Sequence, residues 1–260
     1  MNLFRRNEHR GITSSALRLW GLFFALAGAV SYGILQNRLL GISGASAQEV
    51  LERMQESSTY MTMASVALVL QAAETCAVPI FALMVVEGAL HTKSLPKYLL
   101  RVLLAALAAE IPFNLLFGTG FLDFSVQNPS FALALGLVML RLYLFFPAKS
   151  WSHRFVRLFV TLAAILWAEM LQIHHGTPLI LLTAVFWLLR ENTRYRGLIS
   201  AGVALCCTFI SPFYLAAPFG AMAAHVYNGK QGSENRIVNY ALYPAMLLIT
   251  WARAVFFLGA

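Results

Sequence analysis

A few ionisable side chains lie inside runs of apolar residues, and their chemistry needs explaining first. A charge in the hydrocarbon core of a membrane costs about 3 kcal/mol or more, so it usually faces a partner or a water-filled cavity. We therefore treat these positions as candidate functional residues. They are Glu74, Glu87, Glu110, Arg141, Glu169, His225 and Arg253, accompanied by the uncharged polar residues Gln71, Thr75, Asn114 and Thr208.

Glu87 and His91 have the spacing that brings two side chains together on one face of a helix. Glu87 can then orient His91 and raise its basicity, which predicts a general base or a proton relay. The alternative is structural, because a histidine at a helix end is stabilised by the helix dipole and solvated at the membrane surface. Both interpretations stay open at this point.

Glu110 and Asn114 repeat this spacing around Pro112. A proline leaves a backbone carbonyl without its usual partner and bends the helix. We expect the two polar side chains to form the wall of a cavity that receives substrate. The alternative is an interhelical hydrogen bond that only fixes packing.

Lys97 and Arg101 lie near the start of a predicted span, with Tyr98 between them. A guanidinium group can hold a phosphate by two parallel hydrogen bonds, so the pair predicts a site for an anionic, phosphate-bearing cosubstrate. The alternative is that both side chains extend toward lipid headgroups.

His174 and His175 are adjacent in a short loop. Neighbouring residues on a regular backbone point in different directions, so we expect these two to be solvated rather than to share a site. No Cys/His spacing resembles a zinc site, and the sequence predicts no metal centre. The three cysteines lie in apolar stretches and are expected to pack as small hydrophobic side chains.

The composition excludes an ordinary soluble domain, because 59% of the 260 residues are hydrophobic and only 12% are charged. Runs of about 20 apolar residues match the hydrocarbon core, and the lack of strict alternation favours helices. The predicted fold is an all-α, polytopic transmembrane helix bundle of eight or nine spans, some of them broken by proline. The candidate spans are 14–34, 60–90, 97–117, 130–147, 155–172, 178–190, 197–211, 213–227 and 238–258.

The run from Tyr60 to Thr92 is too long for one straight span. We expect it to be kinked at Pro79 or to begin outside the membrane. Between the first two spans, Ser46 and Glu49 have the spacing of a capping box, which predicts a short external amphipathic helix near 46–58.

The net charge of +8 does not indicate nucleic-acid binding, because the basic residues form short clusters between apolar runs. Every second connection is basic, which places the N-terminus inside and the C-terminus outside. We divide the chain into a basic cytoplasmic N-terminus, 1–13, and a single transmembrane domain, 14–260. The basic clusters are Arg5, Arg6 and Arg10; Lys93 and Lys97; Lys149 and Arg154; Arg194 and Arg196; and Lys230 and Arg236.

Several stretches combine polar and apolar residues in a specific order. They are PIFALMVVEGALHT at Pro79–Thr92, YLLR at Tyr98–Arg101, EIPFN at Glu110–Asn114, Gln127-Asn128 before FALALG at Phe131–Gly136, YNGKQG at Tyr227–Gly232 and YALYP at Tyr240–Pro244. These stretches resemble the TraX family of membrane proteins, whose founding member is associated with N-terminal acetylation of a conjugative pilin. The resemblance covers about two thirds of the chain.

The resemblance implies an integral-membrane acyltransferase of the bacterial cytoplasmic membrane. It would move an acetyl or other acyl group from acyl-CoA, a cosubstrate and not a permanently bound cofactor, to a protein amine such as that of a pilin-like subunit, or to another acceptor. Its partners would be membrane lipid and the acceptor, with no nucleic acid. The implied catalytic residues are His91, Glu87 and Glu110. The implied cosubstrate-binding residues are Lys97, Arg101, Tyr227, Asn228 and Lys230, and the implied substrate-binding residues are Asn114, Gln127 and Asn128.

One part of the family pattern is absent. The family places an Asp-His pair in the first span, where the histidine would be the natural catalytic base, and here Gly28 and Ala29 occupy those positions. Either another histidine has this role, with His91 as our first choice, or this branch has lost the reaction and retains binding functions.

Two other classes of function remain open. The intramembrane glutamates would also suit a small transporter or lipid-handling protein, although the chain has no obvious internal repeat. A non-catalytic partner of a conjugation or secretion apparatus is the third hypothesis.

Overall fold

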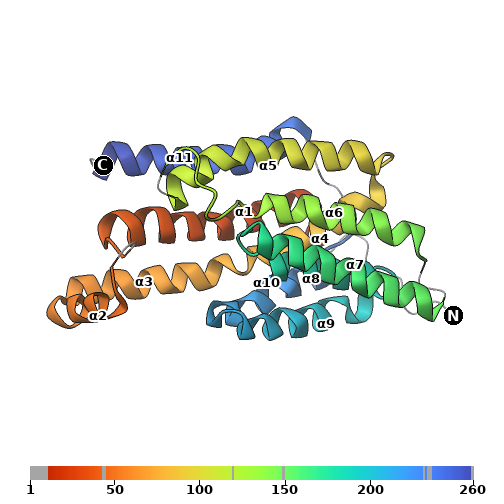
Figure 1. Cartoon of the computed structure of the whole chain (residues 1–260), viewed down its shortest axis with the longest axis horizontal. Helices are drawn as coiled ribbons and strands as arrows, with labels where there is room; N and C mark the ends of the chain where they lie inside the picture. The colour runs from red at the N-terminus through yellow and green to blue at the C-terminus, as the bar shows by residue number, and fades with distance from the viewer. Residues whose placement is uncertain are drawn as a thin grey trace.

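The computed structural model describes residues 11–42, 45–118, 120–147, 150–230, 232 and 236–258, and apart from two isolated β-bridges their regular structure is helical (Figure 1). The first ten residues and Lys149 lie outside the described ranges, so the basic residues expected there are not placed. The helices are α1 (Ser14–Ala29) with its π-helical continuation η1 (Val30–Leu39), α2 (Ala47–Glu56), α3 (Ser58–Glu74), α4 (Ala77–His91), α5 (Leu95–Phe117), α6 (Ser130–Phe145), α7 (Trp151–Met170), α8 (Gly176–Leu188), α9 (Thr193–Cys206), η2 (Cys207–Phe209), η3 (Pro212–Ala216), α10 (Ala217–Val226) and α11 (Arg236–Leu258).

The all-α prediction is confirmed, and each of the nine predicted segments coincides with a helix or a pair of consecutive helices. Three helical stretches are long and apolar enough to cross a membrane, namely Ser14–Leu39, Ser58–His91 and Leu95–Phe117. Shorter apolar helices occupy Ser130–Phe145, Gly176–Leu188 and Tyr195–Phe209. These helices indicate a membrane-embedded protein.

The long second stretch is interrupted, as its length predicted. Pro79 has no N–H to offer the carbonyl of Thr75, and the chain leaves α3 after Glu74 and enters α4 at Ala77. The hydroxyl of Thr75 donates to the carbonyl of Ala72 at 2.7 Å and stabilises the break. Glu74 therefore ends a helix about halfway between Ser58 and His91, at the middle of the bundle.

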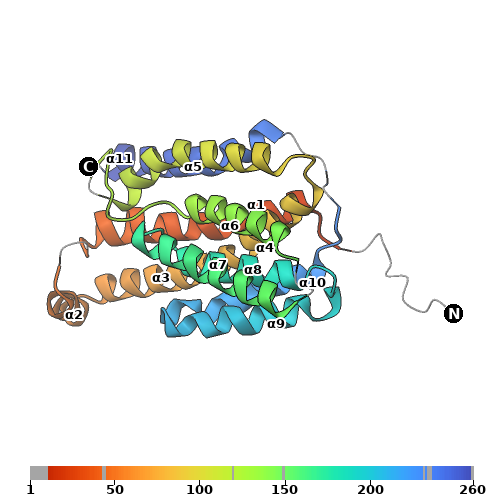
Figure 2. The same ribbon diagram turned by 45° about the vertical axis from the view of Figure 1, so that its right-hand side comes forward.

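The bundle is organised around α4 and α8, which contact each other and are flanked by α1, α6, α7, α9 and α10 (Figure 2). Both helices are apolar on all sides, and such helices are buried. The outer helices instead expose large apolar side chains, for example Phe23 on α1, Val69 on α3 and Phe159 on α7, each more than 60% exposed. Apolar surface on this scale suits lipid and not water.

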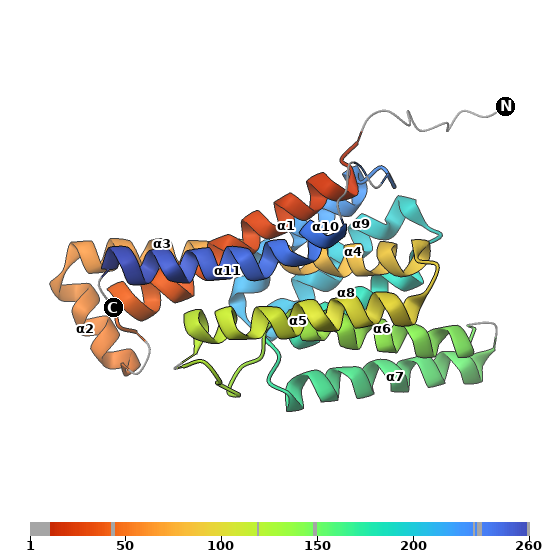
Figure 3. The same cartoon turned by 90° about the horizontal axis from the view of Figure 1, so that it is seen from above.

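The predicted helix between the first two spans is present as α2. Ser46 accepts from the backbone N–H of Glu49 at 3.3 Å, and the Glu49 carboxylate accepts from the Ser46 N–H at 2.9 Å, so the capping box is formed. Figure 3 shows α2 and the end of α11 at one end of the bundle, with the start of α1 and the α4–α5 connection at the other. The described chain thus begins and finishes at opposite ends.

Candidate functional site

A cavity of about 680 Å³ runs between α1, α4, α5 and α11. One end is lined by the α4–α5 connection and by Gly229 from the α10–α11 connection. The other is lined by Glu74 at the α3–α4 break and by His175 of the α7–α8 connection. We call it the main cavity. It joins one end of the bundle to the middle of the long helices.

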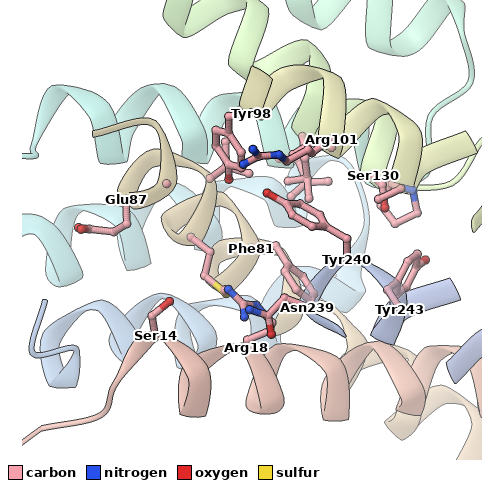
Figure 4. A pocket seen from close by; sticks show the side chains of 18 of the residues that line it. Ser14, Arg18, Phe81, Glu87, Tyr98, Arg101, Ser130, Asn239, Tyr240 and Tyr243 are labelled. Atoms are coloured by element: carbon pink, nitrogen blue, oxygen red, sulfur yellow. The ribbon is translucent and has the colours of Figure 1, made fainter. Parts of the chain in front are cut away.

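The mouth of the main cavity is cationic. Lys93, Lys97 and Arg101 line it from the start of α5 and the turn before it, and Arg18 lines it from α1. Figure 4 shows the guanidinium groups of Arg18 and Arg101 directed into the cavity from opposite walls, with Tyr240 of α11 near Arg101. The two basic residues that the sequence singled out, Lys97 and Arg101, therefore share one cavity with two further cations.

Glu87 and His91 also line the main cavity, but Glu87 has a closer partner than His91. Its carboxylate accepts from Arg196 of α9 at 2.9 Å, whereas His91 Nδ1 lies 3.8 Å away. His91 Nδ1 is instead 2.8 Å from the Glu87 backbone carbonyl, and its side chain is 55% exposed. Glu87 is thus mainly the partner of Arg196 in an ion pair between α4 and α9, and His91 is an exposed histidine at the cavity mouth.

The Tyr-Asn-Gly-Lys element holds the start of α1 in place. Tyr227 is buried, lines the main cavity and forms a parallel β-bridge with Ile12. The N–H of Asn228 donates to the Ile12 carbonyl at 3.1 Å, and the carbonyl of Lys230 accepts from Ser14 at 2.9 Å. The backbone contacts of Asn228 and Lys230 are therefore structural, and they place α1 against the cavity mouth.

The polar residues around the α5–α6 connection form a second structural unit. Asn128 is fully buried and donates from its side-chain amide to Glu110 at 2.5 Å and to the Ala106 carbonyl at 2.9 Å. The side-chain amide of the buried Asn114 donates to the backbone carbonyl of Asp123 and accepts from its N–H, each at 3.3 Å. The described lining of the main cavity does not include Glu110, Asn114, Gln127 or Asn128. The structure therefore does not bring these four residues together with Lys97 and Arg101.

Gln127 has a different role, because its backbone holds the chain that carries two histidines. Its N–H donates to the Gln172 carbonyl at 3.0 Å, and its carbonyl accepts from the His174 N–H at 2.9 Å. The expectation that His174 and His175 are solvated is wrong. Both are largely buried and face Glu74.

The left-handed backbone explains why adjacent histidines point to the same place. Gln172 has a φ of 53° and His175 a φ of 57°, so the loop is not a regular backbone. The two imidazole rings lie 3.9 Å apart, and their Nε2 atoms are 3.5 Å (His174) and 3.6 Å (His175) from Glu74 Oε1. The sequence indicated Glu74 as intramembrane and the histidines as a pair, but nothing in it joined residues 100 positions apart.

A second cavity of about 340 Å³ reaches the same cluster from the other direction. The connections α5–α6, α7–α8 and α9–α10 line it, as do Tyr32 of the π-helix η1 and Gln71. His174 and Tyr214 also line it, and His175 lines both cavities. Glu74, His174 and His175, which we call the central cluster, thus lie between the main cavity and the second cavity.

Gly28 in α1 provides the space for this cluster. A Cβ atom at residue 28 would overlap the carboxyl group of Glu74. The position where the sequence lacks the aspartate of the Asp-His pair is therefore filled in space by a carboxylate from α3. Two imidazoles from the α7–α8 connection lie beside it.

Comparison with known families gives one match. The family model described as TraX protein matches residues 59–252, which is about three quarters of the chain. No curated protein and no solved structure matches the chain. Most of its length is matched by the family model, including α4 with Glu87 and the α7–α8 connection with both histidines, so the chain belongs to the TraX family.

Proposed function

We propose that this protein is an acyltransferase of the bacterial cytoplasmic membrane that uses acyl-CoA as donor. The observation that carries the proposal is one cavity that joins a cationic mouth to a buried carboxylate and histidine. A phosphate-bearing donor needs cations, and its acyl chain needs apolar walls. The main cavity offers both along a single path.

The donor would bind with its phosphates at the mouth. Lys97 and Arg101 on α5, with Lys93 and Arg18, would hold these phosphates, because charge-assisted hydrogen bonds to phosphate are strong. His91 would contact the donor there as well. Apolar side chains such as Phe81 and Val85 line the path inward and would surround the pantetheine arm and the acyl chain.

The acyl group would meet its acceptor at the central cluster. An amine attacks the thioester carbon, the carbon–sulfur bond breaks, and the proton lost by the amine is taken up by the leaving thiolate to give free CoA. The acceptor amine would enter through the second cavity, where Glu169 and Gln172 supply polar contacts. The acceptor would be a protein N-terminus, such as that of a pilin-like subunit.

The proposal includes an orientation. The mouth of the main cavity lies at the end with the basic connections, which would face the cytoplasm, and the second cavity would face outward. All nine helical segments would cross the membrane, several as short or broken helices, so that the N-terminus lies inside and the C-terminus outside. Transfer would then carry an acyl group from a cytoplasmic donor to an external acceptor.

The test is turnover by the purified protein in detergent with radiolabelled acetyl-CoA and a peptide with a free N-terminus. We expect labelled peptide from the wild type and at least a hundredfold less from Glu74→Gln, with His91→Ala retaining turnover at a raised KM. Equal turnover by wild type and Glu74→Gln, or no donor binding by the wild type, would exclude this mechanism.

The same two cavities also suit a carrier, because both reach one ionisable cluster. A carrier would move a solute or lipid headgroup past Glu74 without forming a covalent bond. Uptake into proteoliposomes that is abolished by Glu74→Gln, with no acylated product, would favour this second function.

A further inference from the structure

The central cluster has the form of an empty coordination site. Glu74, His174 and His175 each direct one ligand atom to a common point, and these three atoms all lie within 4.8 Å of one another. Glu74 Oε2 and both Nε2 atoms are buried and have no hydrogen-bond partner within the described part of the chain. Buried polar atoms are normally paired, so two unpartnered Nε2 atoms beside a carboxylate that itself has an unpartnered oxygen call for an occupant.

We propose that Glu74, His174 and His175 bind one divalent transition-metal ion, with Zn²⁺ as the best match. In catalytic zinc sites two histidines and one glutamate are a common ligand set, and a fourth position is left open. Two imidazoles with one carboxylate suit zinc better than magnesium or calcium, which prefer oxygen ligands.

The distances fit coordination better than direct hydrogen bonding. A hydrogen bond from an imidazole N–H to a carboxylate is about 2.7–2.9 Å long. Zn–N and Zn–O bonds of about 2.0–2.1 Å place neighbouring ligand atoms about 3.3 Å apart across a tetrahedron. The observed distances from Glu74 Oε1, 3.5 Å to His174 Nε2 and 3.6 Å to His175 Nε2, are close to that spacing.

Neighbouring residues orient the two imidazole rings, as residues around a metal site orient its ligands. His175 Nδ1 lies 2.5 Å from the Tyr214 hydroxyl, which fixes the ring so that Nε2 faces Glu74. The ring of His174 lies against Tyr32 and Phe117, and Gln127 holds its backbone. A carboxylate buried in this apolar setting would otherwise be poorly compensated, and a divalent cation compensates it.

The open position would face the two cavities, since His175 lines both. If the proposed acyl transfer is correct, and this step rests on it, the ion would polarise the thioester carbonyl of the bound donor. Metal binding itself does not depend on that reaction.

The experiment measures metal binding by the full chain in detergent. Protein stripped with a chelator is titrated with ZnCl₂ and with CoCl₂, and the bound metal is measured by mass spectrometry and by the visible absorption of Co²⁺. We expect about one ion per chain and a tetrahedral Co²⁺ spectrum. Glu74→Gln, His174→Ala and His175→Ala should each weaken binding by roughly tenfold or more, by analogy with lost metal-site contacts.

Matched controls separate this site from adventitious binding by histidine. His91→Ala and His153→Ala remove exposed histidines outside the cluster and should bind zinc like the wild type. Equal binding by the wild type and the Glu74→Gln/His174→Ala/His175→Ala variant would overturn the proposal. If the ligand variants do not fold, X-ray absorption of the zinc-loaded wild type decides, because a shell without two imidazoles overturns it as well.

The outcome is separable from that of the proposed function. Zinc bound at the cluster with no acyl turnover supports the metal site and contradicts the transferase. Full turnover by a protein that binds no zinc supports the transferase and contradicts the metal site.

Discussion

Gly28 of α1 faces the carboxylate of Glu74 so closely that a Cβ atom at residue 28 would overlap it. The contact joins the first helix to the break between α3 and α4, and it sets how far the carboxylate can extend toward His174 and His175. Gly28 lines neither cavity and offers no ligand atom, so a substitution there is a sensitive probe of the central cluster.

Gly28→Ala should displace the Glu74 carboxylate and leave the helix intact, because alanine favours helices. We expect zinc binding and acyl turnover each to fall by about tenfold or more, as when a supporting contact of a metal site is lost. Zinc titration and peptide acetylation measure the two effects. Gly202→Ala is the control, since a Cβ at residue 202 meets no atom within 4 Å. Wild-type zinc affinity in Gly28→Ala would show that the carboxylate is not constrained by α1.

The sequence was sufficient for the elements that depend on local physics. The capping box at Ser46 and Glu49 and the interruption before Pro79 follow from the chemistry of a few neighbouring residues, and both are present. The contact between Glu87 and His91 also follows from helical spacing. The prediction that Lys97 and Arg101 share one site also used only local sequence, because both residues lie at the start of one helix, and both line the main cavity.

The central cluster could not be derived in this way. It needs a left-handed residue at His175, which no local pattern of that loop requires, and it needs α3 and the α7–α8 connection to meet across the bundle. Arg196 is a similar case, because it was counted as a loop cation and is in fact the buried partner of Glu87, 109 residues away. Long-range pairing of polar groups in apolar segments depends on the packing of whole helices.

The Glu87–Arg196 pair predicts a large effect on stability. The side chains are 14% and 8% exposed, so Arg196→Ala leaves a buried carboxylate without its partner. We expect a loss of about 3–5 kcal/mol in the free energy of unfolding, whereas Glu87→Gln/Arg196→Met should lose clearly less because no charge remains. Thermal unfolding in detergent measures both. Glu191→Ala, which removes an exposed pair with Arg190, should cost about 0–1 kcal/mol.

The cationic mouth predicts a change in donor affinity rather than in the chemical step. Lys97→Ala and Arg101→Ala should each raise the KM for acetyl-CoA by about tenfold or more, the usual effect of losing a charge-assisted hydrogen bond, with kcat nearly unchanged. The wild-type KM should also rise with salt. Arg141→Ala removes a cation that lies over the Phe145 ring and should leave KM unchanged. A fall in kcat at constant KM would contradict a role in donor binding.

The capping box of α2 predicts a pH dependence. Hydrogen bonds from the backbone and side chain of Ser46 lower the pKa of Glu49 below its usual value. Glu49 therefore stabilises α2 fully above the unfolded-state pKa, and this contribution is lost as the pH falls through the lower, folded-state pKa. Amide hydrogen exchange in α2, corrected for intrinsic rates, should quicken over that acidic range. Glu49→Gln should show little of this pH dependence, and an unchanged profile would mean that the box does not govern the helix.

Glu74 and Glu110 both lie in helical stretches that are long and apolar enough to cross a membrane, and the structure predicts opposite consequences for them. Glu110 accepts from the backbone and side chain of Asn128, so it joins α5 to the start of α6 and the loop that holds His174. Glu110→Gln replaces an acceptor with an amide that can still accept from Asn128, and it should lower thermal stability moderately while most turnover and zinc binding remain. Glu74→Gln should leave stability near that of the zinc-free wild type, because a buried charge is removed, and should abolish zinc binding and turnover. Paired measurements of the unfolding temperature, zinc content and kcat on the two variants test this division. If Glu110→Gln loses turnover while it stays folded and zinc-loaded, then Glu110 acts in the reaction itself, as the sequence suggested, and the reacting groups extend beyond the central cluster.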